Sequence, residues 1–255
     1  MIAITNLTKR YGDFVAVNSL DLNVAAGEIL GFLGPNGAGK TTTIRMLMGL
    51  LQPTSGRVLL GGHDVQREPE RAKALAGFIP DRPFIYEKLT GNEFLQFAGK
   101  LHHVESGQLR RRAGNLLERL DLTPWQDERI EGYSHGMKQR IVVCAALLHQ
   151  PRIVIVDEPM VGMDPRGART LKDLFCELAE NGTAVFLSTH SISVAEEICH
   201  RIGIIQRGRL IACGSAADIR GRSQDRGGNL ESAFLEMTLE QSAPEGVASG
   251  AAGQS

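Results

Sequence analysis

The stretch GPNGAGKT at residues 34–41 decides the fold class of this chain. It follows the pattern GxxxxGK[ST] at every fixed position. A short apolar run, EILGFL (28–33), comes directly before it, and the segment TTTIRMLMGLL (41–51) has the apolar content of a helix. A glycine-rich loop between a buried strand and a helix predicts a turn whose backbone N–H groups cradle the phosphates of a nucleotide.

The residue types of this loop match the chemistry of phosphate binding. Glycine permits the backbone turns that point successive N–H groups at phosphate oxygens. Lys40 can reach the outer phosphates, the Thr41 hydroxyl can hold Mg²⁺, and the start of the helix adds a partial positive charge. A glycine-rich turn without a ligand is the alternative. The predicted nucleotide-binding residues are Gly34, Pro35, Asn36, Gly37, Ala38, Gly39, Lys40, Thr41 and Thr42.

A second, acidic motif supplies the partner of this loop. RIVIVDEP (152–159) is an apolar run ended by proline, which predicts a buried strand with Asp157 and Glu158 at its carboxyl end. There Asp157 would hold Mg²⁺ through water, and Glu158 would polarise a water molecule for in-line attack on a γ-phosphate. Alternatively, the two carboxylates only cap the end of the strand.

Apolar strands alternate with helices along most of the chain, which predicts an α/β fold with a mainly parallel core sheet. A hairpin is expected to turn at Arg207-Gly208. The strands are expected at 15–24, 28–33, 57–62, 152–157 and 183–190, and helices at 165–182 and 191–200.

Two regions depart from this alternation. From about Thr90 to Gln150 the sequence has helical periodicity and no strand signal, so we expect a helical subdomain inserted into a sheet domain that spans 1–220. The remaining part, 221–255, predicts a turn-rich linker, a short helix (LESAFLEMTLE, 230–240) and a tail of disordered composition.

Composition and charge argue against several classes of protein. The chain has 255 residues, of which 42% are apolar, and its net charge of -1 gives no support for binding nucleic acid. No apolar run approaches the roughly 18 residues of a membrane-spanning helix, and the first residues lack the layout of a signal peptide. We therefore expect a cytosolic chain. Four scattered cysteines without metal-site spacing favour a reducing compartment: Cys144, Cys176, Cys199 and Cys213.

Taken together, the motifs resemble those of one family, the ATP-binding subunits of ABC transporters. The resemblance covers about residues 2–220, and its six elements come in the order typical of the family: Tyr11 in TKRYGDFVAVN, GPNGAGKT, YSHGMKQR (133–140), IVIVDE, VGMD (161–164) and STH (188–190). It implies a P-loop NTPase core with an N-terminal antiparallel β part, ATP hydrolysis with ATP and Mg²⁺ as cofactors, and stacking of adenine on Tyr11.

The stretch YSHGMKQR needs its own explanation, because one nucleotide needs only one cradle. Ser134 and Gly136 stand at the start of a predicted helix, where hydroxyl and N–H groups can meet a phosphate. Alone, this serine would be a local helix cap. The resemblance implies instead a head-to-tail dimer in which both residues contact the γ-phosphate of ATP held by the partner copy. It also implies that Asp164 lies at the dimer seam and that His190, otherwise an ordinary strand-end residue, hydrogen-bonds the γ-phosphate and orients the attacking water.

The chain departs from the family pattern at two positions. Asp81 stands where the family usually has a glutamine near Mg²⁺ or the attacking water. A third carboxylate beside Asp157 and Glu158 would tighten metal binding or raise a neighbour's pKa; alternatively, Asp81 belongs to a simple turn whose charge Arg82 neutralises. His135 stands where glycine is common, and it either lies near phosphate or is exposed without a role.

The leading functional hypothesis is an energising subunit: ATP binding closes the dimer, hydrolysis opens it, and separate multi-span permease chains move the cargo. The chain would lie peripherally on the cytoplasmic side of the membrane. Its YSHGMKQR stretch, which matches the family's signature motif, and its late helix (230–240) resemble those of ABC-2 type exporters. The alternatives are a soluble ABC-type ATPase that is not coupled to transport and a nucleotide-sensing scaffold; Glu158 and His190 argue against the scaffold.

Four aromatic residues beside Asp81 either pack in the core or receive a helix of the membrane partner: Phe84, Tyr86, Phe94 and Phe97.

Overall fold

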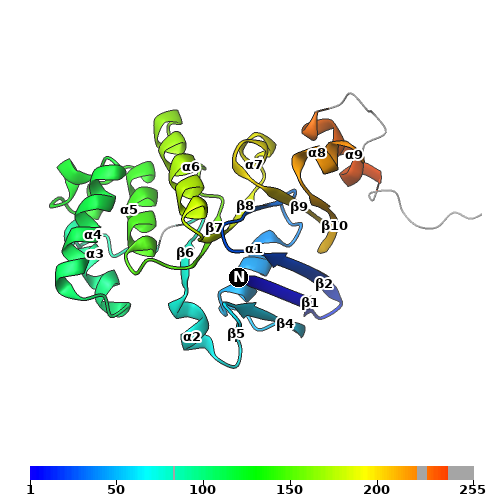
Figure 1. Cartoon of the computed structure of the whole chain (residues 1–255), viewed down its shortest axis with the longest axis horizontal. Coiled ribbons are helices and arrows are strands. Elements are labelled where there is room, and N and C mark those ends of the chain that lie inside the picture. Colours follow the sequence, from blue (N-terminus) through cyan, green and yellow to red (C-terminus); the bar gives the residue numbers. More distant parts are fainter. Residues whose placement is uncertain (83, 223–228, 241–255) are drawn as a thin grey trace, which may run out of the picture.

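The structure of the chain, a computed structural model, describes residues 1–82, 84–222 and 229–240. Two β-sheets with surrounding helices form the body, and a group of helices extends from one side of it (Figure 1). The strands are β1 (Ile2–Tyr11), β2 (Phe14–Val24), β3 (Ile29–Leu33), β4 (Ser55–Leu60), β5 (His63–Asp64), β6 (Ala76–Ile79), β7 (Ile153–Asp157), β8 (Ala184–Thr189), β9 (Arg201–Gln206) and β10 (Arg209–Gly214). The α-helices are α1 (Lys40–Leu47), α2 (Pro69–Ala74), α3 (Gly91–Leu101), α4 (Ser106–Arg119), α5 (His135–Leu147), α6 (Pro165–Glu180), α7 (Ile192–Ile198), α8 (Ala216–Arg220) and α9 (Leu230–Glu240).

A six-stranded sheet in the order β10-β9-β3-β8-β7-β6 positions the functional site. All of these strands are parallel except β10, which confirms the predicted mainly parallel sheet. Every residue of β3, β7 and β8 is buried, as expected for strands covered on both faces. In this register Leu33 pairs with Thr189 and Asp157 with Ser188, so the carboxyl ends of β3, β8 and β7 meet at one edge.

A second sheet, in the order β2-β1-β4-β5, is antiparallel throughout and confirms the expected N-terminal antiparallel part. Its apolar side chains share one core with α1 and with one face of the parallel sheet, where the Phe32 and Phe186 rings lie 5.1 Å apart. β1 was not predicted. Register shifts between Ile4 and Arg10 interrupt its alternation of buried and exposed residues, so no period of two runs through the sequence.

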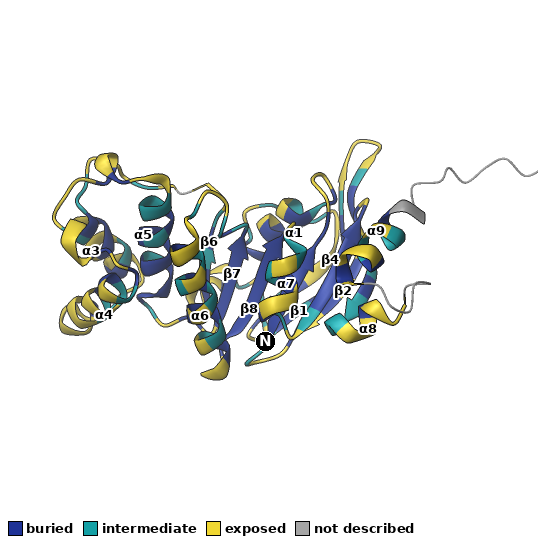
Figure 2. Ribbon diagram, turned by 90° about the horizontal axis from the view of Figure 1, so that it is seen from above, coloured by how far each residue is buried: buried dark blue, intermediate teal, exposed yellow. Residues whose placement is uncertain are grey.

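The predicted helical insertion is confirmed: α3, α4 and α5 form the group at one side of the molecule (Figures 1 and 2). Within 91–150, all of which the structure describes, no strand is present. The insertion packs closely against the parallel sheet at Gly77 of β6, where a Cβ atom would lie 2.5 Å from the carbonyl oxygen of Ala146 in α5. The absence of a side chain at Gly77 therefore sets the approach of α5 to the sheet.

Several predicted boundaries need correction. Helix α1 ends at Leu47, whereas the sequence suggested a longer helix, because Gly49 takes a left-handed φ of 62°. Gly56 was expected before a strand but lies within β4, where a Cβ would lie 2.2 Å from the carbonyl oxygen of Asn6. The hairpin at Arg207-Gly208 is confirmed, with both residues at positive φ.

The late helix is confirmed as α9, whose Leu230 and Ala233 are buried against α7 and the β9-β10 end of the sheet. The predicted linker at 223–228 and tail at 241–255 lie outside the described residues. Among the described residues, no helix is long and apolar enough to cross a membrane. All four cysteines are free thiols.

Two Gly→Ala variants test the contact between α5 and β6. Gly77→Ala forces a Cβ against the Ala146 carbonyl, so we expect it to lower the free energy of unfolding by about 1–3 kcal/mol. Gly114→Ala lies in α4, where a Cβ meets nothing within 4 Å, and should raise it by about 0.5–1 kcal/mol. Urea unfolding measures both values, and equal effects of the two variants would contradict this account of the packing.

Candidate functional site

The glycine loop between β3 and α1 has a backbone that side chains would disrupt. Gly37 and Gly39 have φ values of 79° and 110°, a region that other residues rarely adopt. A Cβ on Gly39 would lie 2.6 Å from the carbonyl oxygen of Ala16, and one on Gly34 would lie 2.4 Å from that of Ile205. Among the residues that the structure describes, no side chain caps the N-terminus of α1, which leaves its first N–H groups available to a phosphate.

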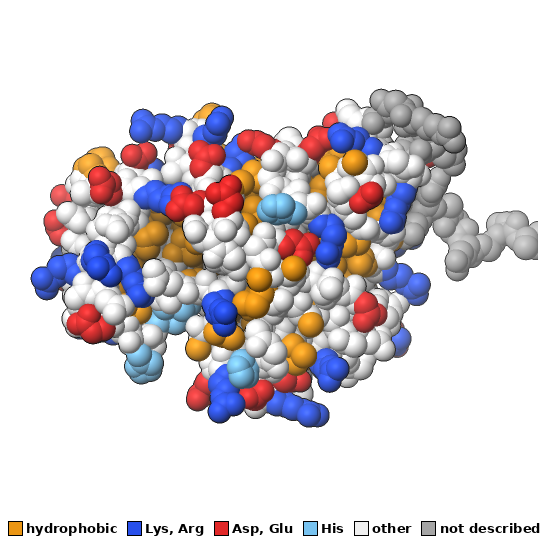
Figure 3. All heavy atoms as spheres, in the orientation of Figure 1, with side chains coloured by type: hydrophobic (Ala, Val, Ile, Leu, Met, Phe, Trp, Pro, Cys, Tyr) orange, Lys and Arg blue, Asp and Glu red, His pale blue; other side chains and the backbone are white. Residues whose placement is uncertain are grey.

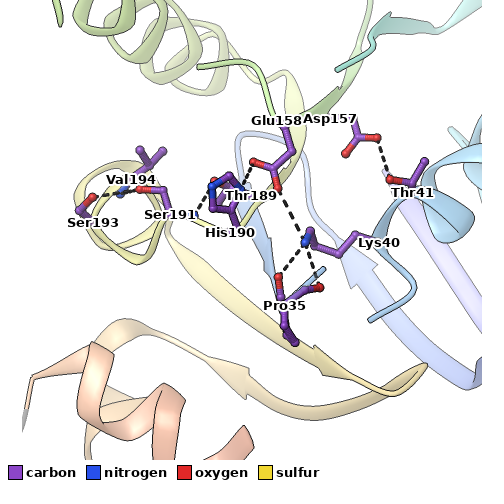
Figure 4. A network of polar contacts seen from close by, with 11 residues as sticks. Pro35, Lys40, Thr41, Asp157, Glu158, Thr189, His190, Ser191, Ser193 and Val194 are labelled. Atoms are coloured by element: carbon purple, nitrogen blue, oxygen red, sulfur yellow. Dashed lines mark hydrogen bonds and ion pairs between the residues drawn. The ribbon is translucent and has the colours of Figure 1, made fainter. Parts of the chain in front are cut away.

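The Lys40 side chain is buried inside this loop, with 7% of its surface exposed. Its Nζ donates hydrogen bonds to the carbonyl oxygens of Gly34 (2.7 Å) and Pro35 (3.3 Å) and lies 3.7 Å from Oε1 of Glu158 (Figure 4). Burying an ammonium group is costly unless oxygen atoms surround it. These contacts therefore hold one positive charge at the centre of the loop.

Glu158 connects Lys40 to His190. Its second oxygen, Oε2, lies 2.9 Å from Nδ1 of His190, so one carboxylate joins residues that come from α1 and from the end of β8 (Figure 4). The Glu158 side chain is 15% exposed and that of His190 58%. Glu158 also has a left-handed φ of 49°, and its N–H donates to the carbonyl oxygen of Ser188. Non-glycine residues held in this region concentrate at functional sites.

Asp157, next to Glu158, is buried and incompletely paired. Its Oδ2 accepts a hydrogen bond from Thr41 Oγ1 (3.3 Å), whereas its Oδ1 is buried without a hydrogen-bond partner among the described residues. Burial raises the pKa of Asp157 above its usual value, and the nearby carboxylates of Glu158 and Asp81 raise it further. Burial with one unpaired oxygen thus disfavours the charged form of this carboxylate.

Mg²⁺ fits this arrangement. The cation prefers hard oxygen ligands such as carboxylates, hydroxyls and phosphates. The unpaired oxygen of Asp157 and the hydroxyl of Thr41 are such ligands, and a divalent cation would offset the burial of the Asp157 charge. The uncapped helix start beside them fits a phosphate for the same electrostatic reason.

A pocket of about 350 Å³ lies against the loop. Residues from the loop, from the ends of β6 and β7 and from β2 line it: Phe14, Ala16, Pro35, Asn36, Gly37, Gly39, Lys40, Thr41, Thr42, Asp81, Asp157 and Glu158. The predicted loop residues missing from this lining are Gly34 and Ala38, which are buried beneath it. Asp81 therefore does share the pocket with Asp157 and Glu158.

Tyr11, the residue predicted to contact adenine, does not line this pocket. It is 49% exposed, and its ring lies 5.2 Å from Nζ of Lys9. Its partner across the β1-β2 turn, Phe14, is 64% exposed and does line the pocket. The sequence analysis missed Phe14, although an aromatic residue three positions after Tyr11 was a signal.

Ser134 and Gly136 lie away from the phosphate loop of their own chain. Neither residue lines the pocket, and α5, which begins beside them, lies beyond α6 in both ribbon views (Figures 1 and 2). Ser134 Oγ caps α5 by accepting a hydrogen bond from the Met137 N–H (3.3 Å). A Cβ on Gly136 would meet nothing within 4 Å. The structure thus brings together Lys40, Asp157, Glu158 and His190 but not Ser134 and Gly136.

Gln139 is a second residue that the sequence analysis missed. Only 1% of its surface is exposed, and its Nε2 donates to the carbonyl oxygen of Pro80 (3.3 Å), the residue before Asp81. This contact ties α5 to the loop that carries Asp81. Gln139 precedes the buried Val142 by three residues and the buried Val143 by four. This helical spacing places the three side chains on one face, and it could have indicated that Gln139 faces inward.

Comparisons with known proteins agree with this geometry. A family model described as ABC transporter matches residues 17–161. The chain is 39% identical to the linearmycin resistance ATP-binding protein LnrL of Bacillus subtilis, covering 87% of this chain and 71% of that protein. It is equally identical to the daunorubicin resistance ATP-binding protein DrrA3 of Streptomyces coeruleorubidus, covering 87% of this chain and 70% of the other.

Solved structures give the same result. The structure of an ATP-binding subunit of an ABC transporter superposes with a TM-score of 0.88 at 31% identity, covering 93% of this chain and 99% of that one. The dimeric structure of a bacterial ABC transporter cassette superposes with a TM-score of 0.78 at 25% identity, covering 84% and 98%. The chain therefore belongs to the ATP-binding proteins of ABC transporters, and as a member of that family it is an ATPase.

Proposed function

We propose that this chain powers an ABC transporter of the exporter type by Mg²⁺-dependent ATP hydrolysis within a head-to-tail dimer, with residues 1–220 as the ATP-binding domain. The observation that carries the proposal is the position of Glu158 between Lys40 and His190. It puts a carboxylate next to the loop whose N–H groups and lysine suit the outer phosphates of ATP.

In this mechanism each residue has a separate task. Lys40 exchanges its carbonyl contacts for the outer phosphate oxygens, where its charge offsets the charge that develops during transfer. Glu158 accepts a proton from the attacking water, and His190 holds the Glu158 carboxylate in place and contacts the γ-phosphate. Thr41 and Asp157 would hold Mg²⁺, which would supply positive charge to offset that of the phosphates, and Asp81 would offer a further oxygen ligand from the lining of the same pocket.

The dimer is supported by the separation of the two phosphate-contacting motifs. Ser134 is exposed at the start of α5, and Gly136 has open space above it, so both can approach a second molecule. The Ser134 oxygen accepts a hydrogen bond from Met137, but its hydroxyl proton can still be donated, so this helix start is suited to the γ-phosphate that the loop of the partner copy presents. Asp164, at the start of α6, would lie at the interface of the two copies. Tyr11, which pairs with the pocket residue Phe14, would contact adenine.

An exposed aromatic surface supports docking to a membrane-spanning chain. Phe84 is 89% exposed and Tyr86 60%, and Tyr86 stacks edge-on against Phe97, with the ring centroids 5.3 Å apart. Phe94, by contrast, is buried in the core. A groove of about 550 Å³ is lined by Phe84 and by residues of α3, α5 and β6. Figure 3 shows apolar side chains gathered between the helical insertion and the body of the molecule. Apolar surface of this kind is suited to an apolar helix of a partner.

The names of two relatives support the proposed direction of transport. Both are named as resistance proteins, one for linearmycin and one for daunorubicin. Resistance fits removal of a compound from the cell, which agrees with the exporter-like signature and late helix of this chain. We therefore propose that the chain lies on the cytoplasmic side of the membrane and powers export through separate permease chains.

Glu158→Gln tests the catalytic base. The amide cannot accept the proton of the attacking water, so we expect kcat to fall by at least about 100-fold while ATP is still bound. Glu118→Gln in the exposed part of α4 is the matched control and should keep kcat within about twofold. Phosphate release from the purified chain measures both. Retained turnover in Glu158→Gln would remove this residue from the mechanism.

Asp157→Asn tests the buried charge. Because the folded pKa of Asp157 is raised above its usual 3.8, protonation stabilises the fold at low pH, and this contribution is lost as pH rises through the raised pKa. The asparagine carries no charge. Without nucleotide, we expect the variant to be more stable than the wild type near about pH 7, with the difference vanishing toward about pH 4. Thermal unfolding across this range checks it; a less stable variant at neutral pH would contradict the assignment.

The membrane partner can be tested directly by tagged purification from mild-detergent extracts of native membranes. We expect a stoichiometric membrane-spanning protein with the wild type and a loss of about tenfold with Phe84→Asp, because the charge disrupts an apolar contact. Trp125→Asp, an aromatic residue that is 49% exposed outside the groove, should retain the partner. Purification of the wild type with cytosolic chains alone would contradict the transport function while leaving the ATPase chemistry intact.

A further inference from the structure

His135 and Gly162 form a steric contact between the signature helix and the turn that follows Glu158. A Cβ built on Gly162 would lie 2.8 Å from Cδ2 and 3.3 Å from Nε2 of the His135 ring. His135 is the first residue of α5, and Gly162 lies between β7 and α6. Helix α6 stands next to α5 in Figures 1 and 2. The imidazole thus occupies the space that a side chain at residue 162 would need.

Only glycine satisfies both demands at residue 162. Its φ of 75° lies in the left-handed region, and its missing Cβ leaves room for the ring. The reverse also holds, because a glycine at residue 135 would remove the three atoms that lie nearest to the space above Gly162. The ring of His135, which stands where the family usually has glycine, therefore fills the space that the missing side chain of Gly162 leaves open.

The turn that contains Gly162 is short and internally bonded. The N–H of Val161 donates to the carbonyl oxygen of Glu158 (3.4 Å), and the N–H of Met163 donates to that of Met160 (3.3 Å). One residue further on, Asp164 caps α6. The bond from Val161 thus links the backbone beside Gly162 directly to Glu158, whose own φ is left-handed.

We propose that His135 is a positioning residue that connects the signature helix to the catalytic turn of the same chain. The inference rests on the proposed function. When Ser134 engages ATP held by the partner copy, the adjacent His135 ring fixes Gly162 and with it the Glu158 carboxylate. Each chain would thereby align its own base in response to ATP in the opposite site. The ring acts by its shape, through van der Waals contact, and needs no charge.

A double-mutant cycle in the full chain tests this contact. His135→Ala removes the ring, and we expect kcat for ATP to fall about tenfold with KM within about twofold of the wild type, because the glycine loop that holds Lys40 is untouched. His135→Phe keeps a flat ring and should restore most of kcat.

Gly162→Ala should also lower kcat about tenfold, by collision with His135. The double variant His135→Ala/Gly162→Ala should lose only about tenfold, not about a hundredfold, because the collision is gone.

Gly182→Ala is the matched control for backbone strain. Gly182 has a φ of 88°, and a Cβ there meets nothing within 4 Å, so the variant carries the left-handed strain without a steric contact. Its melting temperature should fall as much as that of the His135→Ala/Gly162→Ala chain, while its kcat stays at the wild-type value.

The proposal would be overturned by a kcat for His135→Ala within about twofold of the wild type, or by losses in the double variant that multiply. A loss in His135→Phe equal to that in His135→Ala would also overturn it, because the imidazole would then act through its polar atoms. If the wild-type chain itself hydrolysed no ATP, the proposed function would fail instead, which separates the two claims.

Discussion

The carboxylate of Glu158 can serve the phosphate loop only because neighbouring parallel strands end at the same edge of the sheet. β3 leads into the loop that holds Lys40, β7 ends one residue before Glu158, and β8 ends one residue before His190. The registers between these strands place their last residues opposite one another. Because the strands are fully buried, the position of each group is set by the core rather than by flexible loops.

The charges at this edge are balanced only in part, and that imbalance suits the ligand. Lys40 is surrounded by oxygen atoms of its own loop and faces Glu158, while one oxygen of Asp157 is buried and has no partner in the described part of the chain. Burial raises the pKa of Asp157, which means that the fold is less stable with this group charged. Mg²⁺ and phosphate together bring the opposite charges, so nucleotide binding and local stability are linked.

The sequence was sufficient for the fold class and for the main groups of the site, because glycine loops and strand-end carboxylates have strong local signals. GPNGAGKT requires glycine for backbone reasons that the φ values of Gly37 and Gly39 confirm. β1 was not predicted, because bulges disrupt its alternation of buried and exposed residues. Phe14 and Gln139 were not predicted as site residues, because their roles depend on segments that lie near them only in the folded chain. The contact of His135 with Gly162 is of the same kind: two segments 27 residues apart meet only after folding. Local patterns predict elements and motifs, whereas contacts between distant segments need the structure.

The central claim is that each ATP lies between the phosphate loop of one copy and Ser134 of the other. The most direct test is an experimental structure of the Glu158→Gln chain with ATP and Mg²⁺, in which hydrolysis is slow enough to keep the γ-phosphate. The account predicts two nucleotides at the interface of a symmetric pair, with Ser134 Oγ and the Gly136 N–H of one copy within hydrogen-bond distance of the γ-phosphate held by the other. A single copy that holds ATP with Ser134 facing solvent, or a pair that contacts ATP through other surfaces, would contradict it.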